Sequence, residues 1–144
     1  MFQLNYRSEA TPDLDLEELQ NILTVAKEKN AQRDISGCLI FHKNCFVQIL
    51  EGKKEDVLQL YEKIKEDDRH NNITLLWENE VENRYFPDWN MAYYNPEDKN
   101  LRLYLDNMLL LSELSIRSSA SLLSFWASVR TILRKGNERE FENK

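Results

Sequence analysis

The chain has 144 residues, the length of one compact domain, with only three glycines and three prolines. Its 25 acidic residues outnumber its 19 basic residues and give a net charge of −6. This balance argues against nucleic-acid binding, because phosphate neutralisation requires a basic face. No apolar run approaches the roughly 20 residues of a membrane span, and the N-terminus is charged where a signal peptide is apolar. We therefore expect a cytoplasmic protein.

Two smaller features have structural explanations. Arg130, Arg134 and Lys135 form a basic cluster that indicates a solvated helix face more readily than a phosphate site. Cys38 and Cys45 lie in apolar runs, without the close pairing or the histidine companions of a zinc site. We expect two reduced core thiols and no metal.

Hydrophobic periodicity predicts the elements in chain order. Residues 2–7 alternate polar and apolar side chains, which is typical of a strand, and Tyr6 lies on the apolar face. Residues 13–18 offer carboxylates for the cap and first turn of a helix. Apolar side chains then repeat at helical spacing, which predicts a helix as far as Asn30.

The middle of the chain adds a hairpin, a helix and two strands. Residues 35–41 and 45–50 are β-rich runs separated by three polar residues, which predicts a hairpin. Residues 55–66 have helical spacing. Residues 73–77 and 89–94 are two further strand candidates, joined by a charged loop.

The predicted order is β-α-β-β-α-β plus one strand, the split βαβ arrangement of a ferredoxin-like α+β fold. We expect a five-stranded mixed sheet with both helices on one face. The crossovers are expected to be right-handed, and the first and third strands to be neighbours that run parallel.

The C-terminal third of the chain carries two apolar stripes at helical spacing. The first consists of Leu101, Leu105, Met108 and Leu109, and the second of Leu122, Trp126, Val129 and Leu133. The open face of the sheet, with Val47 and Ile49, needs a cover, so we predict two helices docked there. The alternative is a helical arm that dimerises. The expected division is a domain of residues 1–95 and a helical extension of residues 96–144.

Common catalytic motifs are absent from the sequence. There is no glycine-rich phosphate loop, no HExxH, no GxSxG and no pair of closely spaced cysteines. With only His42 and His70, a histidine-based catalytic site is poorly supplied. These absences argue against a hydrolase or a kinase.

Two polar side chains stand in apolar rows. Gln48 shares its strand face with Phe46 and Leu50, and Tyr6 shares its face with Leu4, so both point toward the predicted helices. A buried amide or phenol without a partner costs roughly 1–3 kcal/mol. The residues alone leave two interpretations open: the pair satisfies itself, or it faces a bound polar group.

Other candidate residues have structural explanations as well. Asn30 would be a helix cap, because asparagine tolerates the left-handed conformation. Arg69 and His70 follow the second helix, where cations complement the helix dipole. Trp89 and Met91 would ordinarily belong to the core.

Several short segments nevertheless form one pattern along the chain. They are Tyr6-Arg7-Ser8, Asn30, Ile35-Ser36-Gly37, Phe46-Val47-Gln48-Ile49-Leu50-Glu51-Gly52, Asp67-Asp68-Arg69-His70 and Phe86-Pro87-Asp88-Trp89-Asn90-Met91. Over about residues 1–94, this set resembles the BLUF family of blue-light sensors using FAD. Ser36 stands where the family often has Thr, and Lys29 where it often has other polar or aromatic groups.

The resemblance implies a flavin ring between the two helices, edge-on to the strands that carry Tyr6 and Gln48. Ile22 and Ile64 would enclose the ring. The implied cofactor-binding residues are Tyr6, Ile22, Lys29, Asn30, Phe46, Gln48, Ile64, Asp67, Arg69 and His70. By similarity, Asn30 would bind the pyrimidine edge and Arg69 would reach O2. Lys29, Asp67 and His70 would lie toward the ribityl and phosphate end.

The resemblance also implies a photochemical switch. Tyr6 is a neutral phenol at pH 7, with a reference pKa of about 10, and can release an electron and a proton together. The Gln48 amide can exchange the donors and the acceptor that it presents. Light would move an electron and a proton from Tyr6 by way of Gln48. Their return would leave the amide rearranged, with a new hydrogen bond to flavin O4 and a red-shifted absorption.

The implied output runs through Trp89 and Met91 to the C-terminal helices. From there we expect an effect on an unidentified protein partner or on assembly, with a homo-oligomer as the expected state. Two alternatives remain beside this non-catalytic sensor. One is a flavin-free interaction module of the same fold, and the other is an enzyme such as a flavin oxidoreductase or a small ferredoxin-like hydrolase.

Overall fold

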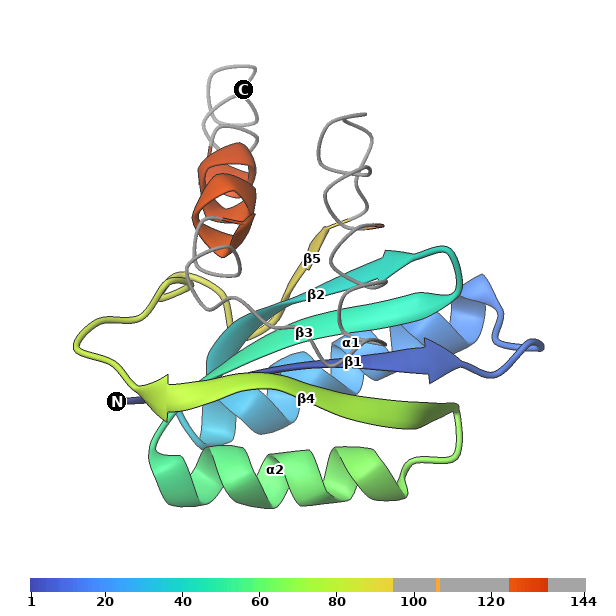
Figure 1. Cartoon of the computed structure of the whole chain (residues 1–144), viewed down its shortest axis with the longest axis horizontal. Coiled ribbons are helices and arrows are strands. Elements are labelled where there is room, and N and C mark those ends of the chain that lie inside the picture. The colour runs from blue at the N-terminus through green and yellow to red at the C-terminus, as the bar shows by residue number, and fades with distance from the viewer. Residues whose placement is uncertain (95–105, 107–124, 135–144) are drawn as a thin grey trace.

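The computed structural model describes residues 1–94, residue 106 and residues 125–134 (Figure 1). Its elements are β1 (Phe2–Ala10), α1 (Leu16–Gln32), β2 (Ser36–His42), β3 (Cys45–Gly52), α2 (Lys54–Glu66), β4 (His70–Glu80) and β5 (Ala92–Tyr94). A further helix covers residues 125–134. The predicted order of strands and helices is confirmed.

The five strands form one mixed sheet in the order β4-β1-β3-β2-β5, in which only β2 and β5 are parallel. The first and third strands are neighbours as predicted, but the expectation that they run parallel is wrong, because β1 and β3 are antiparallel. Helix α1 returns the chain so that β2 runs in the direction of β1. The tight turn at Lys43 and Asn44, with φ of 48° and 62°, then reverses it. β3 enters between β1 and β2 and opposes both.

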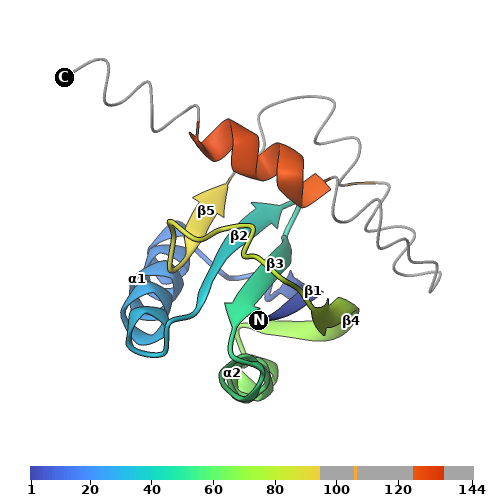
Figure 2. The ribbon, with the colours of Figure 1, turned by 90° about the vertical axis from the view of Figure 1, so that its left-hand side faces the viewer.

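The sheet separates two layers (Figure 2). Helices α1 and α2 cover one face, and helix 125–134 lies against the other. Val47 and Ile49 of β3 pack there with Trp126 and Val129 in one buried cluster. The predicted docking of the second C-terminal stripe is thus confirmed for the residues that are described. The first stripe and Leu122 lie outside them.

Helix α1 differs from the prediction at its C-terminal end. Its N-cap is a carboxylate as expected, since Asp15 Oδ1 accepts a hydrogen bond of 2.8 Å from the Glu18 N–H. The helix continues to Gln32, so Asn30 lies within it and the prediction that Asn30 caps it is wrong. The left-handed backbone falls at Asp34, with φ of 55°.

The last two strands also differ in length. β4 begins at His70, earlier than predicted, because it follows β1 along its whole length through two register shifts. β5 begins only at Ala92. The Trp89 N–H donates to the Phe86 carbonyl at 3.4 Å, so Trp89, the first residue of the predicted strand, belongs instead to the turn around Pro87.

The remaining expectations concern the thiols and the membrane. Both cysteines are reduced thiols that form no disulfide. Cys38 is buried as expected, whereas Cys45 is partly exposed and not a core residue. Burial raises the pKa of Cys38, so it stays protonated and behaves as a small apolar side chain. In the described parts of the chain, no helix has the length and apolar character needed to cross a membrane.

Candidate functional site

A cavity of about 290 Å³ opens between α1, α2 and the face of the sheet that these two helices cover. Its lining includes every residue predicted to bind the cofactor: Tyr6, Ile22, Lys29, Asn30, Phe46, Gln48, Ile64, Asp67, Arg69 and His70. Met91 lines it too. Trp89 does not, since it packs against the apolar cluster on the opposite side of the sheet.

Tyr6 and Gln48 are direct cross-strand partners in the antiparallel pairing of β1 and β3. The Tyr6 hydroxyl donates a hydrogen bond to Gln48 Oε1. Gln48 Nε2 in turn donates to Met91 Sδ at 3.3 Å. All three side chains are buried. The two polar residues do satisfy each other, and they also form part of the cavity wall.

The surroundings of Tyr6 hold its phenol in the neutral form. Burial raises the pKa of Tyr6 far above its ordinary value, and the neighbouring Tyr61 and Asp67 raise it further. The Tyr6 ring lies 5.5 Å from the Tyr61 ring, measured between centroids. A neutral phenol keeps its proton available for the hydrogen bond to Gln48.

The Asn30 side chain on α1 is hydrogen-bonded to the backbone of the residue before Met91. This side chain is 2% exposed, and Nδ2 donates to the Asn90 carbonyl at 2.9 Å. The Asn90 amide donates to the Ile35 carbonyl at 3.1 Å. Asn30 is therefore held near Met91 by long-range contacts.

The edge of the cavity near the end of α2 is charged. Arg69 Nε lies 2.9 and 3.1 Å from the two carboxylate oxygens of Asp67. These hydrogen bonds lower the pKa of Asp67. His70 contacts Ser8 Oγ at 2.7 Å and the Ile64 carbonyl at 2.6 Å, as expected for a histidine at a helix C-terminus.

Six lining residues were not predicted: Asn21, Val25, Ala26, Leu39, Leu60 and Lys63. Helical spacing could have found three of them, because Val25 and Ala26 follow Ile22 by three and four positions and Leu60 precedes Ile64 by four. Leu39 is the cross-strand partner of Gln48 on β2. Asn21 and Lys63 carry no signal beyond adjacency to predicted residues.

The lining fits a flavin. Ile22 on α1 and Ile64 on α2 supply apolar side chains, and Gln48 and Asn30 supply amides for a ring edge of carbonyl and N–H groups. The cavity volume is near the lower end of small-molecule sites, about 300 Å³. Among the described residues, Gln48 Nε2 donates only to the Met91 thioether, a weak acceptor. An amide that also faces a ligand has this kind of incomplete pairing.

A family model described as sensors of blue-light using FAD, or BLUF, matches residues 1–92. The chain belongs to the BLUF family. BLUF domains are sensory modules, so the matched region is a blue-light photoreceptor that uses FAD and is not an enzyme.

Curated and solved relatives agree with this assignment. The photoactivated adenylate cyclase subunit beta of Euglena gracilis is 36% identical over 90 residues, which are 62% of this chain and 10% of that protein. The chain therefore spans about a tenth of that relative. The solved structure of BlsA in its photo-activated state is 31% identical, with a TM-score of 0.78 over 90% of this chain and 94% of that one. BlrB in its dark state, 24% identical over 90% of this chain and 95% of that one with a TM-score of 0.74, shares the fold.

Proposed function

We propose that this BLUF domain detects blue light through the hydrogen-bond chain Tyr6–Gln48–Met91. The observation that carries the proposal is the position of the Gln48 amide between a phenol that donates to its oxygen and a thioether that accepts from its nitrogen. Each end of this amide therefore has a different partner. A rotation of the amide changes both contacts at once.

The residues of the chain divide the work as follows. FAD, when bound, absorbs the light and accepts an electron. Tyr6 supplies that electron, and its hydroxyl proton has a direct path to Gln48 Oε1 along the existing hydrogen bond. Burial keeps both groups away from water. The electron would therefore return to Tyr6 together with the proton, which comes back by the same path, so Tyr6 ends as the neutral phenol.

The lasting change is a rearranged Gln48 amide. With Nε2 turned toward Tyr6, the amide presents a donor where it presented an acceptor, and the donors that face the cavity change. Such a change shifts the flavin absorption to longer wavelength. The rotated carbonyl also faces Met91 Sδ, which has no hydrogen to donate, so the contact with Met91 is lost.

The other lining residues hold the cofactor. Ile22 and Ile64 enclose the ring, and Phe46 closes the wall beside Gln48. Asn30 serves the pyrimidine edge. Lys29, Asp67, Arg69 and His70 serve the ring O2, the ribityl chain and the phosphates. The support is that all of these side chains line one cavity with apolar walls and a charged edge.

The output leaves through the last strand. Met91 faces the cavity, and Trp89, two residues earlier, packs on the side of the sheet that helix 125–134 covers. We divide the chain into a flavin domain of residues 1–95 and a helical extension of residues 96–144, in line with the family match to residues 1–92. The extension acts on a downstream protein or on self-association in the cytoplasm.

The absorption spectrum of the purified protein tests this function. We expect a yellow protein whose spectrum shifts to the red under blue light and recovers in darkness. A colourless protein would instead be the flavin-free interaction module. Photobleaching with turnover of an added reductant would indicate an oxidoreductase.

A further inference from the structure

Strand β3 holds the segment 84–91 from both sides of the sheet. On the cavity side, Gln48 contacts Met91. On the other side, the Glu51 carboxylate accepts hydrogen bonds of 2.7 Å from the backbone N–H groups of both Tyr85 and Phe86. Strand β3 therefore forms hydrogen bonds with both the start and the end of segment 84–91.

The Glu51 carboxylate is buried and satisfied by hydrogen-bond donors. It is 0% exposed, and Gln3 Nε2 donates a third hydrogen bond to it at 2.9 Å. A buried carboxylate is tolerated only where donors satisfy it, and charge-assisted hydrogen bonds are about twice as strong as neutral ones. Glu51 does not line the cavity, so its role is separate from cofactor binding.

Arg84 reinforces the same end of the segment. Its guanidinium donates to Ser36 Oγ at 2.8 Å and to the Asp34 carbonyl at 2.7 Å. It also lies 3.1 Å from the Asp34 carboxylate. The start of the segment is thus fixed to β3 and to the beginning of β2.

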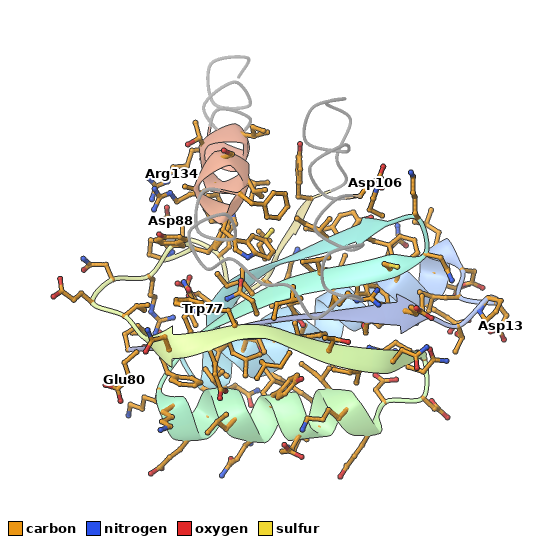
Figure 3. All side chains as sticks on the ribbon, in the orientation of Figure 1. Asp13, Trp77, Glu80, Asp88, Asp106 and Arg134 are labelled. Carbon is orange, nitrogen blue, oxygen red and sulfur yellow. The ribbon has the colours of Figure 1, made fainter. Side chains whose placement is uncertain are left out.

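Helix 125–134 docks on the fixed part of this segment, residues 85–88, which we call the platform. The Phe86 and Trp126 rings meet edge to face with centroids 5.8 Å apart. The Arg130 guanidinium lies 5.1 Å from the Tyr85 ring centroid. At the far end, Arg134 approaches Asp88 with 3.8 Å between Nη2 and Oδ2 (Figure 3). The three helix residues are four positions apart, so they share one face.

We propose that Glu51 is a positioning residue that anchors the platform, so that a change at Gln48 reaches helix 125–134 through Met91 and Trp89. This inference rests on the proposed function of Gln48. While the platform is fixed, a displacement of Met91 must be taken up at residues 89 and 90. Trp89 lies there, with its ring 6.1 Å from Phe86. Without the anchor, the whole segment 84–91 would move with Met91, and helix 125–134 would lose its packing contacts with the platform.

The variant Glu51→Gln tests the anchor, because it keeps the shape of the side chain and removes its charge. The matched control is Glu78→Gln, an exposed carboxylate on β4. For each protein we would record the light-minus-dark absorption spectrum and the amide hydrogen exchange of residues 125–134 in both states. In Glu51→Gln we expect the wild-type red shift, together with helix exchange about tenfold or more faster in darkness and little changed by light.

Two results would overturn the proposal. One is wild-type exchange of residues 125–134 in Glu51→Gln, in darkness and in light. The other needs no variant: the Tyr85 and Phe86 amides of the unmodified protein should stay protected in both states while residues 89–94 change. Light-induced exposure of those two amides equal to that of residues 89–94 would exclude a fixed anchor. Absence of a red shift in the wild type would instead refute the proposed function. The comparison of hydrogen exchange between Glu51→Gln and the wild type in darkness would still test the anchor.

Discussion

At the residue scale, function depends on which hydrogen-bond partner each buried polar atom has. Gln48 lies between a strong donor, the Tyr6 phenol, and a weak acceptor, the Met91 thioether. The hydrogen bond from Tyr6 fixes the orientation of the amide. The contact with Met91 is present only in that orientation. A rotation of the amide would lose only the weak contact with Met91, because Nε2 can donate to the Tyr6 oxygen where Oε1 accepted from it.

Replacing Gln48 by Leu should keep bound flavin and abolish the red shift. The variant leaves the buried Tyr6 hydroxyl without its acceptor, which should destabilise the protein by about 1–3 kcal/mol. Absorption spectroscopy before and after blue light measures the first effect, and urea unfolding measures the second. A full red shift in Gln48→Leu would mean that the amide is not the switch.

Sequence alternation predicted the inward direction of Tyr6 and Gln48, because side chains in a strand alternate with period two. Asn30 could not be interpreted in this way. Its partner is the Asn90 carbonyl, sixty residues away, and local sequence contains no information on such a contact. The cap was the best local explanation, and a tertiary contact overrode it.

At the element scale, the hairpin of β2 and β3 carries the site and tolerates little change. A Cβ atom on Gly37 would lie 2.0 Å from the Ile49 carbonyl oxygen on the neighbouring strand. The family pattern around Gly37 thus has a steric cause. The wrong prediction of parallel strands concerns the same region. The helical crossover and the hairpin, both predicted correctly, already require β3 to oppose β1 and β2, so the connections and not the strand pattern decide the direction.

Gly37→Ala should therefore destabilise the protein by about 3 kcal/mol, since the backbone of β3 must move to admit the methyl group. Gly52→Ala is the matched control. Its Cβ would meet its nearest neighbours at 3.3 Å, so we expect a loss of about 1 kcal/mol. Urea unfolding compares them. Equal stability of the two variants would contradict the close approach at Gly37.

Asp106 links the tip of this hairpin to the C-terminal extension (Figure 3). Its carboxylate lies 2.8 Å from Lys43 Nζ and 2.9 Å from His42 Nε2. The hydrogen bonds from Lys43 and His42 lower the pKa of Asp106 in the folded protein. A lowered folded pKa contributes stability above the unfolded value of about 3.9, and this contribution is lost as the pH falls below it.

Thermal unfolding of wild type and Asp106→Asn between pH 2 and pH 6 tests this link. The wild type should melt at a higher temperature at pH 6, and the difference should vanish toward pH 2. Asp13→Asn, in an exposed turn, should match the wild type at every pH. A difference that persists unchanged to pH 2 would show that the Asp106 charge is not responsible.

At the scale of the whole molecule, the sheet stands between the cavity and the docked helix. Two buried clusters lie on its two faces, and segment 84–91 contributes Met91 to one and Phe86 to the other. Amphipathic stripes predicted the second layer, because an open apolar sheet face requires a cover. The proposed route through Trp89 and Met91 came from the family resemblance. The contacts of Glu51 with the backbone of Tyr85 and Phe86 were not predictable, since backbone contacts of a turn leave no sequence pattern.

Trp126→Ala should lower the stability of the protein without changing its photochemistry. Trp126 is fully buried against the sheet, so its loss should cost about 3 kcal/mol or more. Ile132→Ala, on the same helix but 37% exposed, should cost about 0.5 kcal/mol or less. Both variants should keep the red shift, because the cavity lies on the opposite face. Loss of the red shift in Trp126→Ala alone would show that the extension is part of the photochemical site.

The most direct test of the Tyr6–Gln48 switch is the light-minus-dark absorption spectrum of Tyr6→Phe beside that of Tyr61→Phe. Each variant removes one phenol hydroxyl, and the two rings are neighbours. The Tyr6 hydroxyl donates to Gln48 and Tyr6 lines the cavity, whereas Tyr61 is not among the lining residues. We predict that both variants bind flavin, that Tyr61→Phe shifts to the red as the wild type does, and that Tyr6→Phe does not shift. A normal, reversible red shift in Tyr6→Phe would contradict the account.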